Sequence, residues 1–244
     1  MNQYIPAAGR KVGKTAMLDL LNNTKYFILT GNYGSGKTEL ALNMALCFSE
    51  QYQTTLVDLD IVNPYFRSGE KADEMRSAGV RMLMPTYAMT TVDIPALPAE
   101  IQSVFTMPSE KVIFDVGGDD TGAAALGRFF PSFSAKRNET KMIFVINCMR
   151  PLTKDPVDIM DLAQRIQNRG RLQIDVLINN TNLADRTTPE MIEAGERIVL
   201  SCAEKMKIPH VITAGQADVI EQCRLNTETL FITRHMVPEW MKEQ

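Results

Sequence analysis

Clustered metal ligands are missing from this sequence. The chain has only two histidines and four cysteines, and the cysteines stand far apart, at Cys47, Cys148, Cys202 and Cys223. A zinc or iron–sulfur site needs such ligands at close spacing, typically with a C-x-x-C pair, so the sequence argues against both kinds of site. Because Cys47 and Cys202 fall within apolar helical patterns, we expect buried free thiols, as is usual in a reducing cytoplasm.

Clusters of basic residues and long apolar runs are missing as well. The 244 residues carry a net charge of −3, without the basic face that nucleic-acid binding requires. No apolar run approaches the roughly 20 residues that span a membrane. The start of the chain lacks the basic stretch and apolar core of a leader peptide. We therefore expect a cytoplasmic protein that binds neither nucleic acid nor membrane.

A glycine-rich pattern is the most informative feature that is present. The pattern G-x-x-x-x-G-K-[ST] is matched by eight consecutive residues, namely Gly31, Asn32, Tyr33, Gly34, Ser35, Gly36, Lys37 and Thr38. A strand-like run at 25–30 precedes it and a run of helix formers at 38–48 follows, which is the context of a phosphate-binding loop. Backbone N–H groups and the helix N-terminus would attract phosphate oxygens. Lys37 is expected to reach the β- and γ-phosphates, and the Thr38 hydroxyl to bind Mg²⁺.

Strand-like and helix-like segments alternate through the rest of the chain. We predict strands at 54–60, 80–84, 111–115, 141–147, 173–179 and 209–213, and helices at 67–78, 99–105, 121–130, 156–168 and 189–207, with Pro131 helping to end the third helix. This alternation predicts an α/β fold, in which a mostly parallel sheet of about seven strands carries helices on both faces. We expect one domain over 1–244, with a helical extension at 1–24 and a C-terminal extension at 216–244.

Acidic residues follow two of the predicted strands. Asp58 and Asp60 end the strand at 54–60, and Asp115 begins a D-x-x-G pattern that closes with Gly118. A parallel sheet places ligands at the carboxyl ends of its strands, so these residues are expected beside the glycine-rich loop. Asp115 and Asp58 would join the Mg²⁺ shell, Asp60 would orient an attacking water or acceptor hydroxyl, and the Gly118 N–H would approach the γ-phosphate.

Asparagines end two later strands. Asn147 and Asn179 each offer a donor and an acceptor in one plane, which suits a purine edge, although asparagine is also common in plain turns. A guanine-binding site often has an Asn-Lys pair followed by an Asp. That pattern is absent from 179–183, so we expect ATP rather than GTP.

These motifs together resemble the CobQ/CobB/MinD/ParA nucleotide-binding family of P-loop ATPases over most of residues 24–215. The resemblance implies that Lys37 and Thr38 contact phosphate and Mg²⁺, that Asp60 orients water, that Asp115 is the Walker B carboxylate and that Asn179 contacts adenine. The family's signature lysine, which reaches across a dimer, is replaced here by Asn32, and Tyr33 replaces a glycine. A homodimer would therefore need contacts other than a lysine-bridged ATP sandwich.

Three functions are compatible with these residues. The first is a Mg²⁺-dependent ATPase with Lys37, Asp60 and Asp115 as catalytic residues, acting on an unidentified protein partner or small-molecule substrate. The second is a small-molecule kinase, in which Asp60 orients an acceptor hydroxyl and Arg67 holds its anion. The third is a nucleotide-gated binding module with negligible turnover, in which Tyr65 contributes to a partner surface.

Overall fold

The computed structural model describes residues 23–60, 72–84, 99–118 and 120–236, and in this part eight strands form one sheet. All neighbouring strands are parallel, in the order β3-β2-β4-β1-β5-β6-β7-β8. The strands are β1 (Tyr26–Gly31), β2 (Thr54–Leu59), β3 (Arg81–Leu83), β4 (Lys111–Val116), β5 (Thr140–Ile146), β6 (Val176–Asn179), β7 (His210–Gly215) and β8 (Glu228–Phe231). The predicted α/β class with a parallel sheet is confirmed.

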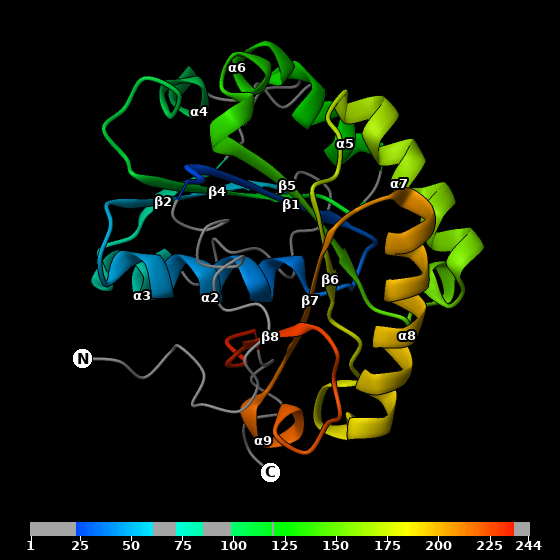
Figure 1. The fold of residues 1–244 in the computed structure, drawn as a ribbon. Helices are drawn as coiled ribbons and strands as arrows, with labels where there is room; N and C mark the ends of the chain where they lie inside the picture. Colours follow the sequence, from blue (N-terminus) through cyan, green and yellow to red (C-terminus); the bar gives the residue numbers. More distant parts are fainter. Residues whose placement is uncertain (1–22, 61–71, 85–98, 119, 237–244) are drawn as a thin grey trace, which may run out of the picture.

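Helices cover both faces of the sheet (Figure 1). One face carries α2 (Lys37–Ser49) and α3 (Ala72–Ser77), and the other carries α4 (Ala99–Ser103), α5 (Asp120–Arg128), α6 (Phe130–Ala135), α7 (Pro156–Gly170) and α8 (Pro189–Met206). The short α9 (Ala217–Ile220) follows β7. Each face of the sheet therefore buries its own apolar layer, which gives the three-layer sandwich.

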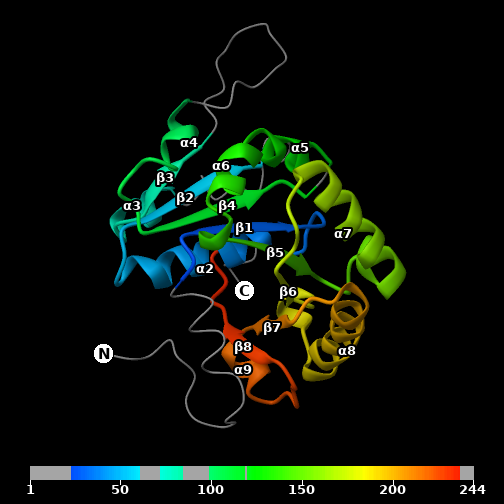
Figure 2. The same ribbon diagram turned by 45° about the horizontal axis from the view of Figure 1, so that its top comes forward.

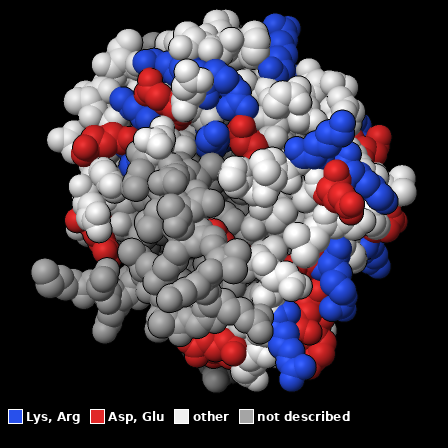
Figure 3. All heavy atoms as spheres, viewed as in Figure 1, with Lys and Arg blue, Asp and Glu red and all other residues white. Residues whose placement is uncertain are grey.

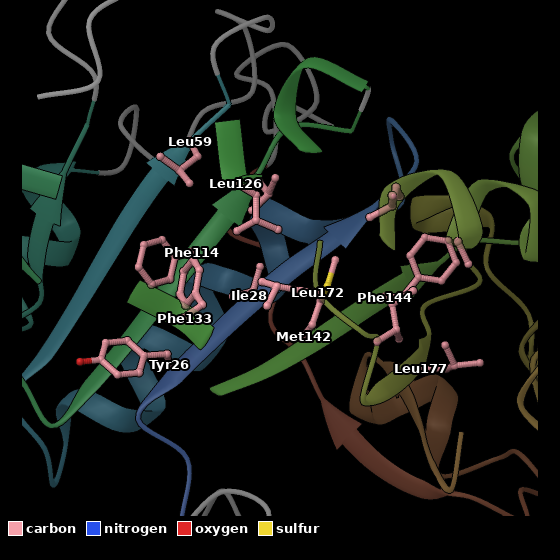
Figure 4. Packing of buried hydrophobic residues seen from close by; sticks show 14 of the residues in the cluster. Tyr26, Ile28, Leu59, Phe114, Leu126, Phe133, Met142, Phe144, Leu172 and Leu177 are labelled. Atoms are coloured by element: carbon pink, nitrogen blue, oxygen red, sulfur yellow. The ribbon is translucent and has the colours of Figure 1, made fainter. Parts of the chain in front are cut away.

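The central strand β1 is buried on both faces, as its unbroken apolar run predicts. Phe27 packs with Phe48 of α2 on one face, with ring centroids 5.0 Å apart. On the other face, Phe133 of α6 meets Phe114 of β4 edge-on at 5.1 Å and lies near Tyr26 (Figure 4). The aromatic packing holds β1 and β4 firmly in place, and the functional residues lie at the ends of these strands.

The C-terminal region differs from the prediction. Within the expected C-terminal extension at 216–244, β8 pairs with β7, which gives eight strands where about seven were expected, and α9 packs beside β8. The sequence signal was weak because β8 has only four residues, all half-buried at the sheet edge. Pro131 is also corrected: it lies in the first turn of α6, where its missing N–H costs no hydrogen bond, and it does not end α5.

Several sequence predictions fall outside the described residues. These are residues 1–22 of the helical extension expected at 1–24, and the first part of the helix expected at 67–78, whose described part is α3. Within the described part of the chain, no helix is long and apolar enough to cross a membrane. On the right-hand side of Figure 3, where α7 and α8 lie, acidic and basic residues are interspersed, as in the Arg165–Asp161 pair of α7.

Candidate functional site

The glycine-rich loop joins β1 to α2 at the carboxyl edge of the sheet. In the sheet, β1 lies between β4 and β5, neither of which follows it directly in the chain (Figure 2). Gly36 immediately precedes α2 with φ of 89°, a left-handed conformation that glycine adopts freely. A Cβ at Gly36 would lie 2.2 Å from Asn180 Nδ2. The tight loop therefore depends on glycine both for its backbone angle and for the close approach of the β6 end.

Two side chains from other strands hold this loop. Asn180, just after β6, donates from Nδ2 to the Ser35 carbonyl at 2.8 Å. Arg150, after β5, donates from Nε to the Gly34 carbonyl at 3.0 Å. Neither residue was singled out from the sequence. For Asn180, its place directly after a buried strand of the sheet was the available signal, whereas nothing in the sequence distinguished Arg150.

Lys37, the first residue of α2, is buried and curls back over the loop. Its Nζ donates to the Asn32 carbonyl at 3.0 Å. A cationic group is thus held inside the curve of the glycine-rich loop, beside backbone N–H groups at a helix N-terminus. Both features favour an anion at this position.

Thr38 and Asp115 meet across 77 residues of sequence. The Thr38 hydroxyl donates to Asp115 Oδ2 at 2.7 Å. The two residues that were both expected to bind Mg²⁺ are therefore in contact. Burial and, to a lesser extent, the adjacent Asp58 carboxylate together raise the pKa of Asp115 to about 7, against the opposing effect of Lys37. The carboxyl group is therefore poised to exchange its proton for a cation.

The second acidic pair lies on the neighbouring strand. Asp58 is opposite Asp115 in the register of β2 and β4 and is buried. Its Oδ1 accepts from the Asp60 N–H at 2.9 Å. Asp60 itself is partly exposed and lines a cavity that is described below. The structure thus brings all three carboxylates to one place, with Asp115 and Asp58 deep and Asp60 nearer the solvent.

Gly118 brings the D-x-x-G segment against the glycine-rich loop. A Cβ at Gly118 would lie 2.6 Å from the Tyr33 N and 2.9 Å from the Asn32 carbonyl carbon. These contacts are with backbone atoms, so a side chain could not be accommodated by a rotamer change. The two motifs that were separated by about eighty residues in the sequence are in direct contact.

A cavity of about 450 Å³ opens beside these residues. One part of its wall comes from the glycine-rich loop, α2, Asp60 and Arg150, and another from the residues after β6 and β7 and from the C-terminal segment. A site of this volume is in the usual range for small-molecule and cofactor pockets. Tyr33 lies at its rim with 60% of its surface exposed.

Unsatisfied polar atoms gather at the same place. In the described residues, four buried side-chain polar atoms lack a hydrogen-bond partner. Three of them are Ser35 Oγ, Asp115 Oδ1 and Asn180 Oδ1, all at the glycine-rich loop, and the fourth is the Tyr26 hydroxyl at the start of β1. Buried polar groups in native proteins nearly always find partners, so this concentration indicates a site built around a polar ligand.

Asn147 and Asn179 are not brought into the cavity. Both are fully buried, and their amides are used within the protein: Asn147 Nδ2 donates to the Asn182 carbonyl at 3.1 Å, and Asn179 Nδ2 donates to the Ile192 carbonyl at 3.1 Å. These are the loop-supporting roles that asparagine also plays in turns. The predicted purine contact from either residue has no support from this geometry. Asn182, three residues after Asn179, does line the cavity.

A second hollow of about 610 Å³ lies at the opposite end of the strands, where β5 and β7 begin. Its wall is formed mainly by lysine, glutamine and methionine side chains, including Lys141, Lys205 and Lys207. It has neither a glycine-rich loop nor the unsatisfied polar atoms of the first cavity. We therefore take the smaller cavity, beside the glycine-rich loop, as the candidate site.

No protein-family model matches this chain, and no curated protein sequence matches it. Among solved structures, the signal recognition particle 54 kDa protein of Aeropyrum pernix K1 in complex with GDP is similar, with 22% identity and a TM-score of 0.50 over 78% of this chain and 42% of that chain. FtsY of Mycoplasma mycoides has 16% identity and a TM-score of 0.52 over 77% of this chain and 59% of that chain.

The signal recognition particle receptor FtsY of Elizabethkingia anophelis has 16% identity and a TM-score of 0.53 over 89% of this chain and 65% of that chain. The chain thus spans about two fifths to two thirds of the length of these three proteins. At these identities the likeness concerns the fold. Together with the parallel sheet and the loop between β1 and α2, it identifies the fold as the α/β fold of P-loop NTPases.

Proposed function

We propose that this protein is a Mg²⁺-dependent ATP-binding protein that hydrolyses ATP and couples its nucleotide state to a partner or substrate. The observation that carries the proposal is the hydrogen bond between Thr38 and Asp115, beside the buried Lys37 and with Asp115 Oδ1 left without a partner. A hydroxyl, a carboxylate and a lysine in these positions are what the phosphates of a nucleotide and their metal ion require.

The residues fit Mg²⁺. Within the described residues, no group of three or more histidine, cysteine, aspartate or glutamate side chains could hold a metal ion by itself. Mg²⁺ typically binds one or two carboxylates together with substrate phosphates and water, and it prefers hard oxygen donors. Thr38 and Asp115 would hold the ion, with Asp58 behind Asp115. When bound, Mg²⁺ would neutralise charge on the phosphate oxygens.

The reaction assigns different tasks to three residues. Lys37 would stabilise the negative charge that moves onto the phosphate oxygens during transfer, together with the N–H groups of the glycine-rich loop. Asp60, the exposed member of the acidic group, would orient the attacking water. Gly118, which already touches the loop backbone, would offer its N–H to the terminal phosphate without obstruction.

The preference for ATP rests on the resemblance and on the carboxylates of the cavity wall. Guanine recognition uses a carboxylate that accepts from the base, and the described wall has only Glu39 and Asp60. Glu39 accepts two backbone N–H groups from the C-terminal segment, and Asp60 lies beside the D-x-x-G segment. Asn182 lines the cavity, but its Nδ2 donates to the Asn180 carbonyl at 2.7 Å and its Oδ1 accepts from the Ala184 N–H at 3.3 Å, so the choice of base does not rest on it. Calorimetry with ATP and GTP tests the choice.

The other two functions stay predictions. The kinase hypothesis rests on Arg67 and the partner-surface hypothesis on Tyr65, and both residues lie outside the described part of the chain. A metabolite screen for a phosphorylated product would identify a kinase. Turnover near background despite tight ATP binding would favour the binding module. Membership of the CobQ/CobB/MinD/ParA family is likewise a proposal that rests on the shared motifs.

The test compares Lys37→Ala and Asp60→Asn with Lys205→Ala, which removes an exposed lysine from α8. Loss of one transition-state charge partner costs about 100-fold or more in rate. We expect Lys37→Ala to lose both ATP binding and phosphate release, Asp60→Asn to keep binding and lose release, and Lys205→Ala to match the parent. Unchanged hydrolysis in Lys37→Ala would refute the proposal.

A further inference from the structure

The five residues after β8 form a strap along the open side of the candidate site. We name residues 232–236 the C-terminal strap; it is red in Figures 1 and 2, where it passes close to α2. Three of its side chains, those of Ile232, Arg234 and Met236, line the same cavity as Lys37 and Thr38. The strap therefore forms part of the wall of the site, although nothing in the sequence predicted a role for it.

Its attachment to α2 is specific. The Asn43 side chain makes two hydrogen bonds with the Thr233 backbone, both 2.8 Å long, one donated by Asn43 Nδ2 and one accepted by Asn43 Oδ1. One turn earlier on the same helix, the Glu39 carboxylate accepts from the His235 N–H at 2.5 Å and the Met236 N–H at 3.1 Å. Two helical positions one turn apart thus hold the backbone of three strap residues, Thr233, His235 and Met236.

The strap is also attached on the far side of the cavity. The Ile232 N–H donates to the Gly215 carbonyl at 2.9 Å, which continues the pairing of β8 with β7. The Arg234 guanidinium forms an ion pair with Asp185, in the short helical turn after β6, and 19% of the arginine side chain is exposed. The strap therefore bridges α2 and the loops that follow β6 and β7, across the mouth of the cavity.

The cavity wall changes in character along its length. Beside the glycine-rich loop it is polar and charged, whereas toward the strap it contains four aliphatic side chains, those of Ile192, Val219, Ile232 and Met236. The one strap cation in the wall, Arg234, is paired with Asp185. Ile232 and Met236 also pack against the apolar layer that includes α2. The Glu39 carboxylate, which lines the same cavity, accepts backbone N–H groups of the strap. The apolar end suits a flat, weakly polar ring rather than another phosphate.

We infer that the C-terminal strap is the outer wall of a nucleobase subsite. The purine ring of the nucleotide lies against Ile232 and Met236, while its phosphates occupy the glycine-rich loop at the other end of the same cavity. This inference rests on the proposed nucleotide binding and adds to it the place and chemistry of base recognition. Burial of a planar ring against aliphatic side chains removes apolar surface from water, which stabilises the complex.

The inference predicts that the two ends of the ligand can be separated by experiment. Isothermal titration calorimetry with Mg-ATP and with Mg-tripolyphosphate measures binding with and without the base. In the double variant Ile232→Ala/Met236→Ala we expect ATP affinity to fall about tenfold, which equals about 1.4 kcal/mol, and tripolyphosphate affinity to stay within about twofold. Val157→Ala, which truncates an exposed aliphatic side chain on α7, is the matched control and should change neither value.

Asn43→Ala is the second variant, since it releases the strap and leaves the apolar side chains intact. It should weaken ATP and spare tripolyphosphate as well, and thermal melting verifies that both variants are folded. An unchanged ATP affinity in both variants would overturn the inference, and so would equal losses for the two probes, because the strap would then act on the loop through α2. Failure of the parent protein to bind either probe would overturn the proposed function and the inference together. If the parent and both variants bind tripolyphosphate normally, the proposed function stands, and the ATP affinities of the variants test the inference alone.

Discussion

Replacing Asp115 by asparagine should make the metal-free protein more stable at neutral pH while removing its activity. Asp115 is 1% exposed, lies opposite Asp58 and has one oxygen without a partner. Ionising such a group in the folded protein is costly, because both burial and the neighbouring carboxylate oppose the negative charge. Asparagine keeps the shape and can still accept the Thr38 hydroxyl bond, but it cannot ionise.

The magnitude follows from the two pKa values. The pKa of Asp115 is about 7 in the folded protein and 3.8 as the ordinary value. Between these values the folded protein binds more protons than the unfolded chain, so stability is full below pH 3.8, falls as pH rises and levels off above about 7. At about 1.36 kcal/mol for each pH unit, the total loss is on the order of 4 kcal/mol.

Urea unfolding in EDTA without nucleotide, at several pH values from 4 to 8, measures the effect. The stability of Asp115→Asn should nearly equal that of the parent at pH 4 and exceed it increasingly up to pH 7. Asp161→Asn, which removes an exposed carboxylate from α7, should follow the parent throughout. A mutant that is less stable than the parent at pH 8 would refute the reasoning, since it would mean that the ionised carboxylate is stabilised by the fold.

Other consequences can be measured with single substitutions. Gly118→Ala places a Cβ 2.6 Å from the Tyr33 N, so we expect a loss of about 1–3 kcal/mol in stability and at least tenfold weaker ATP binding by calorimetry; unchanged binding would contradict the contact. Phe133→Ala should lower the free energy of unfolding by about 3–5 kcal/mol, with ATP affinity retained, because Phe133 packs at the core away from the cavity. Glu196→Ala should lower the free energy of unfolding by about 2–4 kcal/mol, since the buried carboxylate accepts the backbone N–H groups of Asn226 and Thr227 just before β8. A protease should then cleave the chain near β8 faster than in the parent protein. Resistance to proteolysis equal to that of the parent would argue against this anchoring role.

The sequence was sufficient for the central part of the fold. The strands β1, β4 and β5 were predictable because buried parallel strands are continuous apolar runs, and the glycine-rich loop was predictable because its backbone demands particular residues. The approach of Asp58 and Asp115 followed from the rule that carboxyl ends of parallel strands share one edge. These inferences depend on local patterns or on topology, both of which a single sequence contains.

The remaining parts depend on contacts between distant residues. Asn179 and Asn180 have the same chemistry, yet the first supports a loop beneath the cavity and the second holds the glycine-rich loop, and only the packing around α8 decides between them. Arg150 contacts Gly34 because the turn after β5 happens to present it there. β8 has four half-buried residues and no strong pattern of its own, so its pairing is determined by β7 rather than by its own sequence.

The attachment of the strap to α2 has a consequence for the order of events during synthesis. Asn43 and Thr233 are separated by 190 residues, so the strap leaves the ribosome long after α2. At about 5–20 residues per second, the glycine-rich loop is synthesised at least about ten seconds before the strap. The residues that hold the glycine-rich loop, up to Asn180, all precede the strap in the chain. A nascent chain can therefore form the phosphate end of the site first, and it acquires the enclosed site only once the strap has emerged. Tight nucleotide binding would report that β8 and the strap have docked.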